Sequence, residues 1–343
     1  MKSYQNKSDA IKITIMLFIL AAAMLFAAEF GAAQVKLSDI VKVVSGREIA
    51  SNIETILFKV RLPRIITGVL VGGLLSVCGC LMQAILKNRM ADPSVMGISG
   101  GAALGATFVI VTGLDYSLSF IGFSGRFVGA VLGASITFVF IMTVAFTAGK
   151  RGQSSTSSTL LAGIAVSSFT SAMITVLMAL NKEDMERAYM WMLGSLSSSS
   201  VSKSLLLVVM TIIFIPIILF IAPQIDILKL GSTTASTYGI NSNRLMCIVL
   251  TISSILIAVC VADCGIIGFV GLIVPHIVSF AGIKRMRTKI LMCLICGGLL
   301  VLIADTIART IIAPSELPVG AITSLIGAPY FIVQLLKSRE VRK

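Results

Sequence analysis

The sequence predicts an all-α, polytopic membrane protein with about ten transmembrane helices. Of its 343 residues, 57% are hydrophobic and only 13% are charged, whereas about 25% of the residues in a typical soluble domain are charged. Apolar runs of about 20 residues, the length that a helix needs to cross a bilayer core, recur from end to end. Runs such as 205–222 are apolar on every face, which excludes the alternating strands of a closed barrel.

We expect one transmembrane domain over residues 1–343. Its first span follows Lys2, Lys7 and Lys12, and its apolar stretch is longer than the core of a usual signal peptide, so we expect it to be retained. The predicted spans are residues 13–33, 62–86, 94–113, 127–148, 159–180, 204–222, 245–262, 266–283, 290–309 and 319–336.

The distribution of charge predicts the orientation of these spans. With the N-terminus inside, ten spans would leave 17 basic residues and four acidic residues on the inner face, which accounts for the whole formal net charge of +13. Basic residues prefer the cytoplasmic side of a membrane. Both termini are therefore expected in the cytoplasm, and the basic composition requires no nucleic-acid partner.

Small residues at four-residue spacing let membrane helices approach closely. Glycine occurs in this way in 97–105 and again in 125–133. Residues 91–106 and 263–279 show weak sequence similarity to each other. Both segments are glycine-rich, and they would cross the membrane in opposite directions. This similarity favours an inverted repeat of about five helices, as in many transporters.

The sequence contains little that could carry out catalysis. It lacks the G-x-x-x-x-G-K-[ST] motif of a phosphate-binding loop, so ATP hydrolysis is expected elsewhere. The single histidine, His276, argues against histidine triads and multi-histidine metal sites. Cys293 and Cys296 have a redox spacing but lie in an apolar span, and we interpret them as packing residues. We predict no catalytic residue, no metal ligand and no resident cofactor.

Charged residues within spans are informative because they are costly to bury in a membrane. Asp305 and Arg309 are four residues apart on one predicted helix, where they could form an intrahelical ion pair. The other candidate acids, Glu29 and Asp263, lie near span ends. An ion-coupled carrier usually has further intramembrane carboxylates without a basic partner, so this class is disfavoured.

Several short segments of the sequence match a known set of motifs, in the same order along the chain. They are Arg61-Leu62-Pro63-Arg64, Asp92 to Ala102, Leu161-Ala162-Gly163, Trp191 to Leu196, Gly268 to His276, Ala304 to Arg309, Glu316 to Gly320 and Ile326 to Phe331. In this combination the chain, from about residue 57 to 337, resembles the FecCD-type permeases, the membrane-spanning subunits of ABC importers for ferric siderophores, haem and vitamin B12.

The resemblance implies the partners of this chain. Such permeases have ten spans and pair as homodimers or heterodimers. They work with two cytoplasmic ATPase subunits that use ATP-Mg and with an extracytoplasmic substrate-binding protein.

The resemblance also implies roles for particular residues. Arg61, Arg64 and Arg309 would face outward and dock the binding protein; anchoring in the lipid headgroups is the alternative for Arg61 and Arg64. The polar segment 225–244 resembles the family's coupling loop, and its small residues Gly231, Ala235 and Gly239 would form one helical face that meets the ATPase. The inner gate would involve Asn88, Met90, Thr156 and Ser157, with Arg89 in place of the family's usual proline.

The sequence thus predicts a dimeric permease that is not itself an enzyme and that imports a ferric siderophore. Haem or cobalamin import by the same family is the first alternative. An ion-coupled secondary transporter is the alternative from another class.

Overall fold

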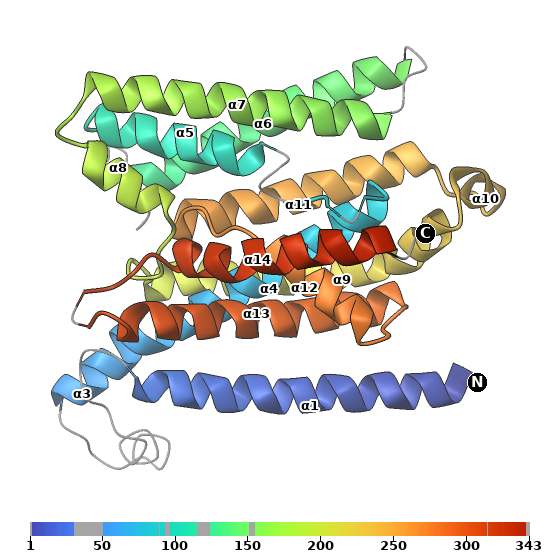
Figure 1. Ribbon diagram of the computed structural model, residues 1–343, viewed down its shortest axis with the longest axis horizontal. Helices are drawn as coiled ribbons and strands as arrows, with labels where there is room; N and C mark the ends of the chain where they lie inside the picture. Colours follow the sequence, from blue (N-terminus) through green and yellow to red (C-terminus); the bar gives the residue numbers. More distant parts are fainter. Residues whose placement is uncertain are drawn as a thin grey trace.

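The computed structural model describes residues 2–30, 51–88, 90–92, 97–114, 124–150, 155–313 and 315–340. Over these residues the chain is helical and contains no strand, which confirms the predicted fold class (Figure 1). The elements are α1 (Lys2–Glu29), α3 (Ser51–Thr55), the π-helical segment η1 (Ile56–Arg61), α4 (Leu62–Ile85), α5 (Ile98–Val111), α6 (Gly125–Lys150), α7 (Ser155–Leu180), α8 (Met185–Met192), α9 (Val201–Lys229), α10 (Ser232–Thr237), α11 (Ser242–Cys264), α12 (Val270–Phe280), α13 (Met286–Thr310) and α14 (Val319–Glu340).

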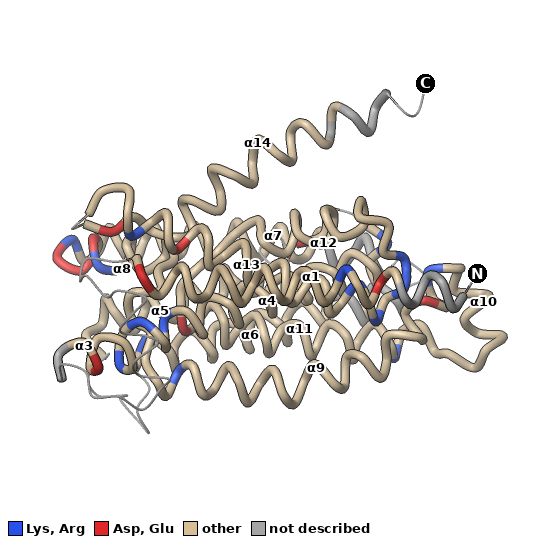
Figure 2. Tube along the Cα trace, turned by 90° about the horizontal axis from the view of Figure 1, so that it is seen from below, with Lys and Arg blue, Asp and Glu red and all other residues tan. Residues whose placement is uncertain are grey.

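Among the described residues, seven helices are long and apolar enough to cross a membrane. Three shorter apolar helices, Ile98–Val111, Val270–Phe280 and Val319–Gln334, accompany them. Each of these ten helices overlaps one of the ten predicted segments, in the same order along the chain. The helices lie side by side, so the bundle has one end that carries α8 and an opposite end that carries α10, here called the α8 end and the α10 end (Figure 1). Charged residues gather at these two ends, which leaves the middle of the bundle apolar (Figure 2).

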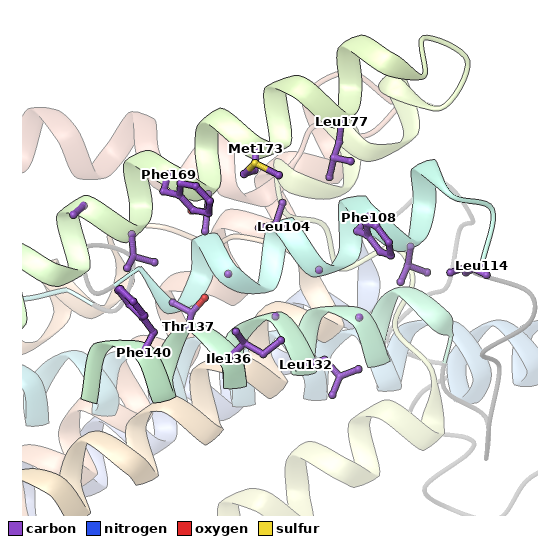
Figure 3. Close-up of a pocket in the computed structure, with 18 residues that line it drawn as sticks. Leu104, Phe108, Leu114, Leu132, Ile136, Thr137, Phe140, Phe169, Met173 and Leu177 are labelled. Atoms are coloured by element: carbon purple, nitrogen blue, oxygen red, sulfur yellow. The ribbon is translucent and has the colours of Figure 1, made fainter. Parts of the chain in front are cut away.

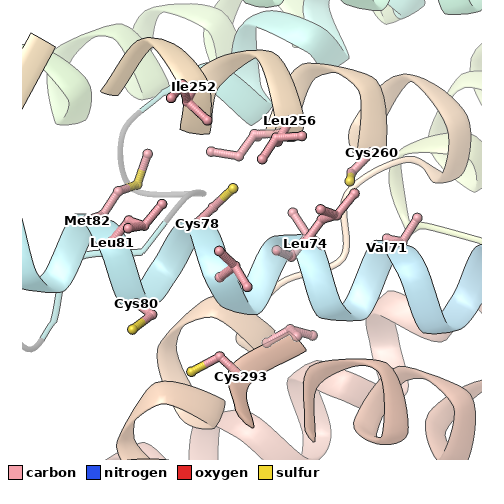
Figure 4. Close-up of a cluster of buried hydrophobic side chains, with 14 of the residues drawn as sticks. Val71, Leu74, Cys78, Cys80, Leu81, Met82, Ile252, Leu256, Cys260 and Cys293 are labelled. Carbon is pink, nitrogen blue, oxygen red and sulfur yellow. The ribbon is translucent and has the colours of Figure 1, made fainter. Parts of the chain in front are cut away.

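Helix α4 forms the centre of the bundle. Most of its residues are buried, including Val71, Leu74, Cys78 and Leu81, each at most 1% exposed. Figure 4 shows these side chains between α11 on one side and α13 on the other. Because α4 is covered on all faces, it is apolar all round and has no polar stripe.

Glycine allows the closest helix contacts. A Cβ atom on Gly72 of α4 would lie 2.2 Å from the carbonyl oxygen of Gly297 on α13. A Cβ atom on Gly105 of α5 would lie 2.0 Å from the carbonyl oxygen of Gly129 on α6. No side chain fits at such distances, so the backbones touch directly, as close packing in a bilayer requires. The two predicted glycine series of α5 and α6 therefore pack against each other.

Helices α5 and α12 are both short, and each begins directly after a residue whose backbone is not helical. The residue that precedes each helix has a left-handed backbone, Gly97 at φ +78° and Phe269 at φ +66°. The two helices run in opposite directions through the bundle (Figure 1). This arrangement fits the inverted repeat that the weak similarity of their sequences favours.

The break before α12 lies inside the protein. Residues 265–268 have no regular structure, and Gly265, Ile267 and their neighbours Cys264 and Val270 are buried. Irregular backbone at membrane depth is tolerated only where protein or water satisfies it. Here the carbonyl oxygen of Cys264 accepts a hydrogen bond of 2.8 Å from the Ser195 N–H.

Candidate functional site

A cluster of five charged side chains lies at the α8 end. It consists of Arg61 at the end of η1, Arg64 in the first turn of α4, Asp305 and Arg309 in the last turns of α13, and Glu316 before α14. We call these five residues the arginine cluster. The three arginines are only 4%, 8% and 5% exposed, and Asp305 is 1% exposed.

Arg64 is at the centre of the cluster. Its Nε donates to both carboxylate oxygens of Asp305 at 3.1 Å, and its Nη2 donates to Asp305 Oδ1 at 2.8 Å. Its Nη1 and Nη2 also donate to the two carboxylate oxygens of Glu316, at 2.9 and 3.0 Å. Charge-assisted, forked contacts of this kind are the strongest hydrogen bonds of arginine. One guanidinium group thus joins α4, α13 and the segment that leads into α14.

The other two arginines hold the end of α1. Arg61 donates to the carbonyl oxygens of Ala28 and Glu29, and Arg309 donates to the carbonyl oxygen of Ala27. The last carbonyl groups of a helix lack partners within the helix and carry partial negative charge, so cations stabilise them. These two side chains therefore fasten α1 to α4 and α13.

The structure places the predicted site residues of this end together, but not in the predicted manner. Arg309 Nε lies 3.7 Å from Asp305 Oδ2, as the spacing of four residues predicts, although Asp305 has much shorter contacts with Arg64. The three guanidinium groups, expected to face outward, are buried and directed at groups of this chain. Sequence reasoning missed Glu316 as a partner of Arg64, although Glu316 belongs to one of the family motifs.

A second buried ion pair lies at the same end. Lys203 Nζ in the first turn of α9 is 3.0 Å from Asp263 Oδ1 at the end of α11, and the two side chains are 13% and 2% exposed. The sequence indicated Asp263 as an intramembrane acid without indicating its partner. Asp263 and Asp305 are each paired with a base, so neither is the unpaired intramembrane carboxylate that an ion-coupled carrier usually has.

Two of the predicted motifs, Trp191 to Leu196 and Glu316 to Gly320, pack against the break before α12 beside this pair. A Cβ atom on Gly265 would lie 2.1 Å from the carbonyl oxygen of Trp191, and one on Gly194 would lie 2.4 Å from that of Ile266. A Cβ atom on Gly320 would lie 2.2 Å from the carbonyl oxygen of Leu193. Gly194 and Gly265 also have positive φ angles, +76° and +71°, which glycine adopts without strain. The start of α14 is thereby packed tightly against the break before α12.

The predicted coupling segment, 225–244, contains the end of α9, the short helix α10 and the start of α11. The prediction that Gly231, Ala235 and Gly239 share one helical face is wrong. Helix α10 extends only over Ser232–Thr237, and both glycines lie outside it with φ angles of +133° and +73°. Ala235 is 0% exposed and packs inside the chain. Residues four apart share a face only within a continuous helix, and the backbones of Gly231 and Gly239 end the helix on either side of Ala235.

Large side chains are exposed on this segment instead. Leu230 is 72% exposed and Tyr238 is 71% exposed, on either side of α10. Beside them the end of α9 is joined to α13, because Asp226 accepts a hydrogen bond of 3.0 Å from the Met286 N–H. Leu230 and Tyr238 are therefore accessible to another protein at this end of the bundle.

The predicted gate residues lie at the α10 end of α4 and in the first turn of α7. Asn88 Oδ1 accepts a hydrogen bond of 2.9 Å from the Met90 N–H, which closes a tight turn after Lys87, whose φ is +48°. Met90 is 43% exposed. Thr156 and Ser157 belong to α7, but their side chains, like Arg89, lie outside the described part of the structure.

Helix α7 has a row of exposed hydroxyl groups at membrane depth, from Ser168, Ser171 and Thr175. Ser168 donates to the carbonyl oxygen of Ile164 at 3.1 Å, and Thr175 donates to that of Ser171 at 2.9 Å. Hydroxyl groups bonded to the carbonyl oxygen one turn earlier are satisfied within their own helix. The row is therefore a polar stripe on the exposed surface of α7.

An apolar groove of about 900 Å³ lies on another face of α7, between α5, α6 and α7. Figure 3 shows Leu104, Ile136, Phe140 and Phe169 directed into it. Of the residues that line the groove, only Thr137 and Thr170 carry a polar group. The groove suits hydrocarbon and is not a site for a charged or strongly polar cargo.

The histidine and the two cysteines considered above, His276, Cys293 and Cys296, lie within the helix bundle. His276 bonds Gln334 of α14 through Nε2, and its ring lies edge-on to Phe280 with centroids 4.9 Å apart. Cys293 is buried and Cys296 is partly buried on α13. Within the described residues, no group of three or more histidine, cysteine or acidic side chains could hold a metal ion.

Comparison with known proteins gives one consistent result. The sequence profile of the FecCD transport family matches residues 17–337. The hemin transport system permease protein of Yersinia pestis is 38% identical over 287 residues, which cover 82% of this chain and 84% of that protein. The Fe(3+)-citrate import system permease protein of Bacillus subtilis is 32% identical over 339 residues, 99% of this chain and 98% of that protein.

A solved structure agrees with these sequence relatives. An inward-facing conformation of a metal-chelate type ABC transporter superimposes with a TM-score of 0.83 and 25% sequence identity. The match covers 96% of this chain and 99% of the solved chain.

Proposed function

The chain belongs to the FecCD transport family and is the permease subunit of an ABC importer, and on this premise we propose that it imports a ferric siderophore. The match of the family over residues 17–337, which include every motif of the predicted pattern, supports the importer part of this assignment. Family members are permease subunits, so we assign ATP hydrolysis, with ATP-Mg, to a separate partner.

The proposed cargo class is an iron chelate because the relatives include a hemin permease and an Fe(3+)-citrate permease. Haem and cobalamin are the alternatives, since cobalamin permeases are also among the relatives. The metal of such a cargo is already held by its chelator, so transport needs no metal ligand from the permease, and no group of three or more side chains that could hold a metal ion lies in the described residues. We therefore assign the choice of chelate to the binding protein.

The ATPase subunits are proposed to bind at the α10 end. The exposed Leu230 and Tyr238 support this assignment, because a partner would cover them. The basic residues at this end, among them Lys12, Lys229 and Lys284, support a cytoplasmic location. Helix α1 begins and α14 ends at the same end (Figure 1), so both termini would be cytoplasmic.

A second permease subunit is proposed to pack against α14. This helix leaves the bundle at an angle (Figure 2). Leu325, Ile332 and Leu336 of α14 are 71%, 58% and 62% exposed. Contact with a second subunit would cover these side chains.

The binding protein is proposed to dock at the α8 end, and Arg61, Arg64 and Arg309 are retained as docking candidates. Their position at the end opposite α10 supports the assignment. Their burial adds a condition, because a partner carboxylate could reach them only if Glu316 or the last carbonyl groups of α1 moved aside. For Asn88, Met90, Thr156 and Ser157, a role in the inner gate likewise remains a proposal.

The test is purification of the chain from membranes with its associated proteins. We expect an ATPase and an extracytoplasmic binding protein to co-purify. The binding protein should then be titrated with a ferric siderophore, hemin and cobalamin while its intrinsic fluorescence is recorded. Quenching by hemin or cobalamin alone would overturn the siderophore assignment, and the absence of an associated ATPase would overturn the importer assignment.

A further inference from the structure

The start of α13 is capped by a residue that is distant in sequence. The first N–H groups of a helix have no partner within the helix, and a nearby side chain usually accepts from them. The preceding residue, Arg285, makes no such side-chain bond. Asp226, in the last turn of α9, accepts from the Met286 N–H at 3.0 Å through Oδ2. A carboxylate at this position also interacts favourably with the helix dipole.

The same aspartate is joined to the segment that leads into α10. Its Oδ1 lies 2.9 Å from Lys229 Nζ, one turn further along α9. Lys229 is followed directly by Leu230, Gly231 and then α10. A second contact supports the first, because Arg287 Nε donates to the carbonyl oxygen of Leu219 on α9 at 3.1 Å. Two hydrogen bonds thus connect α9 to the first residues of α13.

Helix α13 extends from this contact to the arginine cluster. Its 25 residues span about 37 Å at a rise of 1.5 Å per residue. It contains no proline. Near its middle Gly297 and Gly298 pack directly against the backbone of Gly72 and Val69 on α4, so the two helices are held together. At its far end, Asp305 and Arg309 bind Arg64 and the end of α1.

We propose that Asp226 is a positioning residue that joins the α10 segment to α13, so that movement imposed on one end of the bundle is passed along α13 to the arginine cluster at the other. This inference rests on the proposed function, in which an ATPase binds at the α10 end and a binding protein docks at the α8 end. The hydrogen bond to Met286 is the contact that matters, and the ion pair with Lys229 is secondary.

Two variants remove the hydrogen bond from opposite sides. Asp226→Ala removes the acceptor. Met286→Pro removes the donor, and proline is well suited to the first position of a helix. It also removes the Met286 side chain, which is 0% exposed and contacts Lys229, so Met286→Ala, which keeps the N–H, is its matched control. Arg285 already has the extended backbone, φ −71° and ψ 132°, that a residue before proline requires. Asp226→Asn retains an acceptor oxygen, and Lys229→Met retains the bond while it removes the ion pair.

The experiment uses the full transporter in nanodiscs, purified with the ATPase and binding protein that accompany the wild-type chain. ATP hydrolysis is measured without and with the binding protein, which is loaded with hemin in one series and with ferric citrate in another. We expect Asp226→Ala and Met286→Pro to keep their ATPase and their basal hydrolysis but to lose about five-fold or more of the stimulation by the binding protein. Asp226→Asn and Lys229→Met should stay close to wild type.

The outcomes separate this inference from the proposed function. Wild-type protein that is not stimulated would overturn the proposed function, and the inference with it. Normal stimulation in Asp226→Ala and Met286→Pro, with a stimulated wild type, would overturn the inference alone. A loss in Lys229→Met as large as that in Asp226→Ala would also overturn it, because the ion pair would then be the contact that matters. If Asp226→Ala does not assemble, Met286→Pro decides by the same criterion.

Discussion

Replacement of Asp305 by alanine should destabilise the protein more than any other single charge deletion in the arginine cluster. Asp305 is 1% exposed, and its carboxylate receives three hydrogen bonds from Arg64. It also lies 3.7 Å from Arg309. The Asp305→Ala variant would leave Arg64 with Glu316 as its remaining acidic partner and would leave Arg309 beside a second buried cation.

The magnitude follows from burial. Removal of one partner from a buried ion pair costs about 3–5 kcal/mol, because the other charge stays buried without compensation. An exposed pair is worth about 0.2–1 kcal/mol. Asp184 and Arg187 form such a pair at 3.1 Å, and their side chains are 24% and 57% exposed. Asp305→Ala should therefore cost about 3 kcal/mol more than Asp184→Ala, a factor of roughly 100 in the ratio of folded to unfolded protein.

The assay is reversible unfolding of the purified permease in mixed detergent, followed by tryptophan fluorescence from Trp191. Asp184→Ala is the matched control, because it removes an aspartate from the same end of the bundle. Glu316→Gln should fall between the two, since the Glu316 side chain is 37% exposed. The double variant Arg64→Met with Asp305→Leu should recover part of the loss, because apolar residues of similar volume can replace a buried ion pair.

The reasoning would be refuted if Asp305→Ala lowered the unfolding free energy no more than Asp184→Ala does. In that case Arg64 would reach water or another partner once Asp305 is removed, and the burial of the pair would not determine the loss of unfolding free energy.

Three further predictions concern other parts of the bundle. In a background without reactive cysteine, Glu183→Cys at the α8 end should react with an impermeant thiol reagent from outside and Lys284→Cys only after permeabilisation; the reverse pattern would invert the proposed orientation. Leu230→Glu should reduce co-purification of the ATPase by about ten-fold, because it places a charge in the apolar contact, and unchanged co-purification would exclude Leu230 from that contact. Gly105→Ala should reduce the yield of folded protein in membranes, because its Cβ atom would lie 2.0 Å from the carbonyl oxygen of Gly129, and a normal yield would show that α5 and α6 can separate.

The class of the protein could be predicted from its sequence because the bilayer imposes local rules. Each span needs a length of apolar chain set by the thickness of the membrane, and each backbone group must bond within its own helix. The ten segments, the direction of α5 relative to α12 and the spacing of Asp305 and Arg309 all follow from such rules. The family motifs, which are also continuous in sequence, allowed the transport class to be recognised.

The coupling segment shows where local reasoning fails. The spacing of Gly231, Ala235 and Gly239 was interpreted as a helical face, but the backbone of both glycines leaves the helix. Gly has similar access to left-handed and right-handed conformations, so its spacing alone does not show that a helix continues. The tertiary structure determined that Ala235 is buried and that Leu230 and Tyr238 are exposed.

The hydrophobic pattern was enough to predict the all-α membrane class and the approximate position of each membrane segment, because both depend on the local composition of the chain. Which charges meet depends on the tertiary structure. Arg64 and Asp305 are 241 residues apart, and Asp226 and Met286 are 60 residues apart. Such pairs form because helix packing brings their ends together in a medium where an unpaired charge or N–H group is costly, and no periodicity along one helix specifies which helix will be its neighbour.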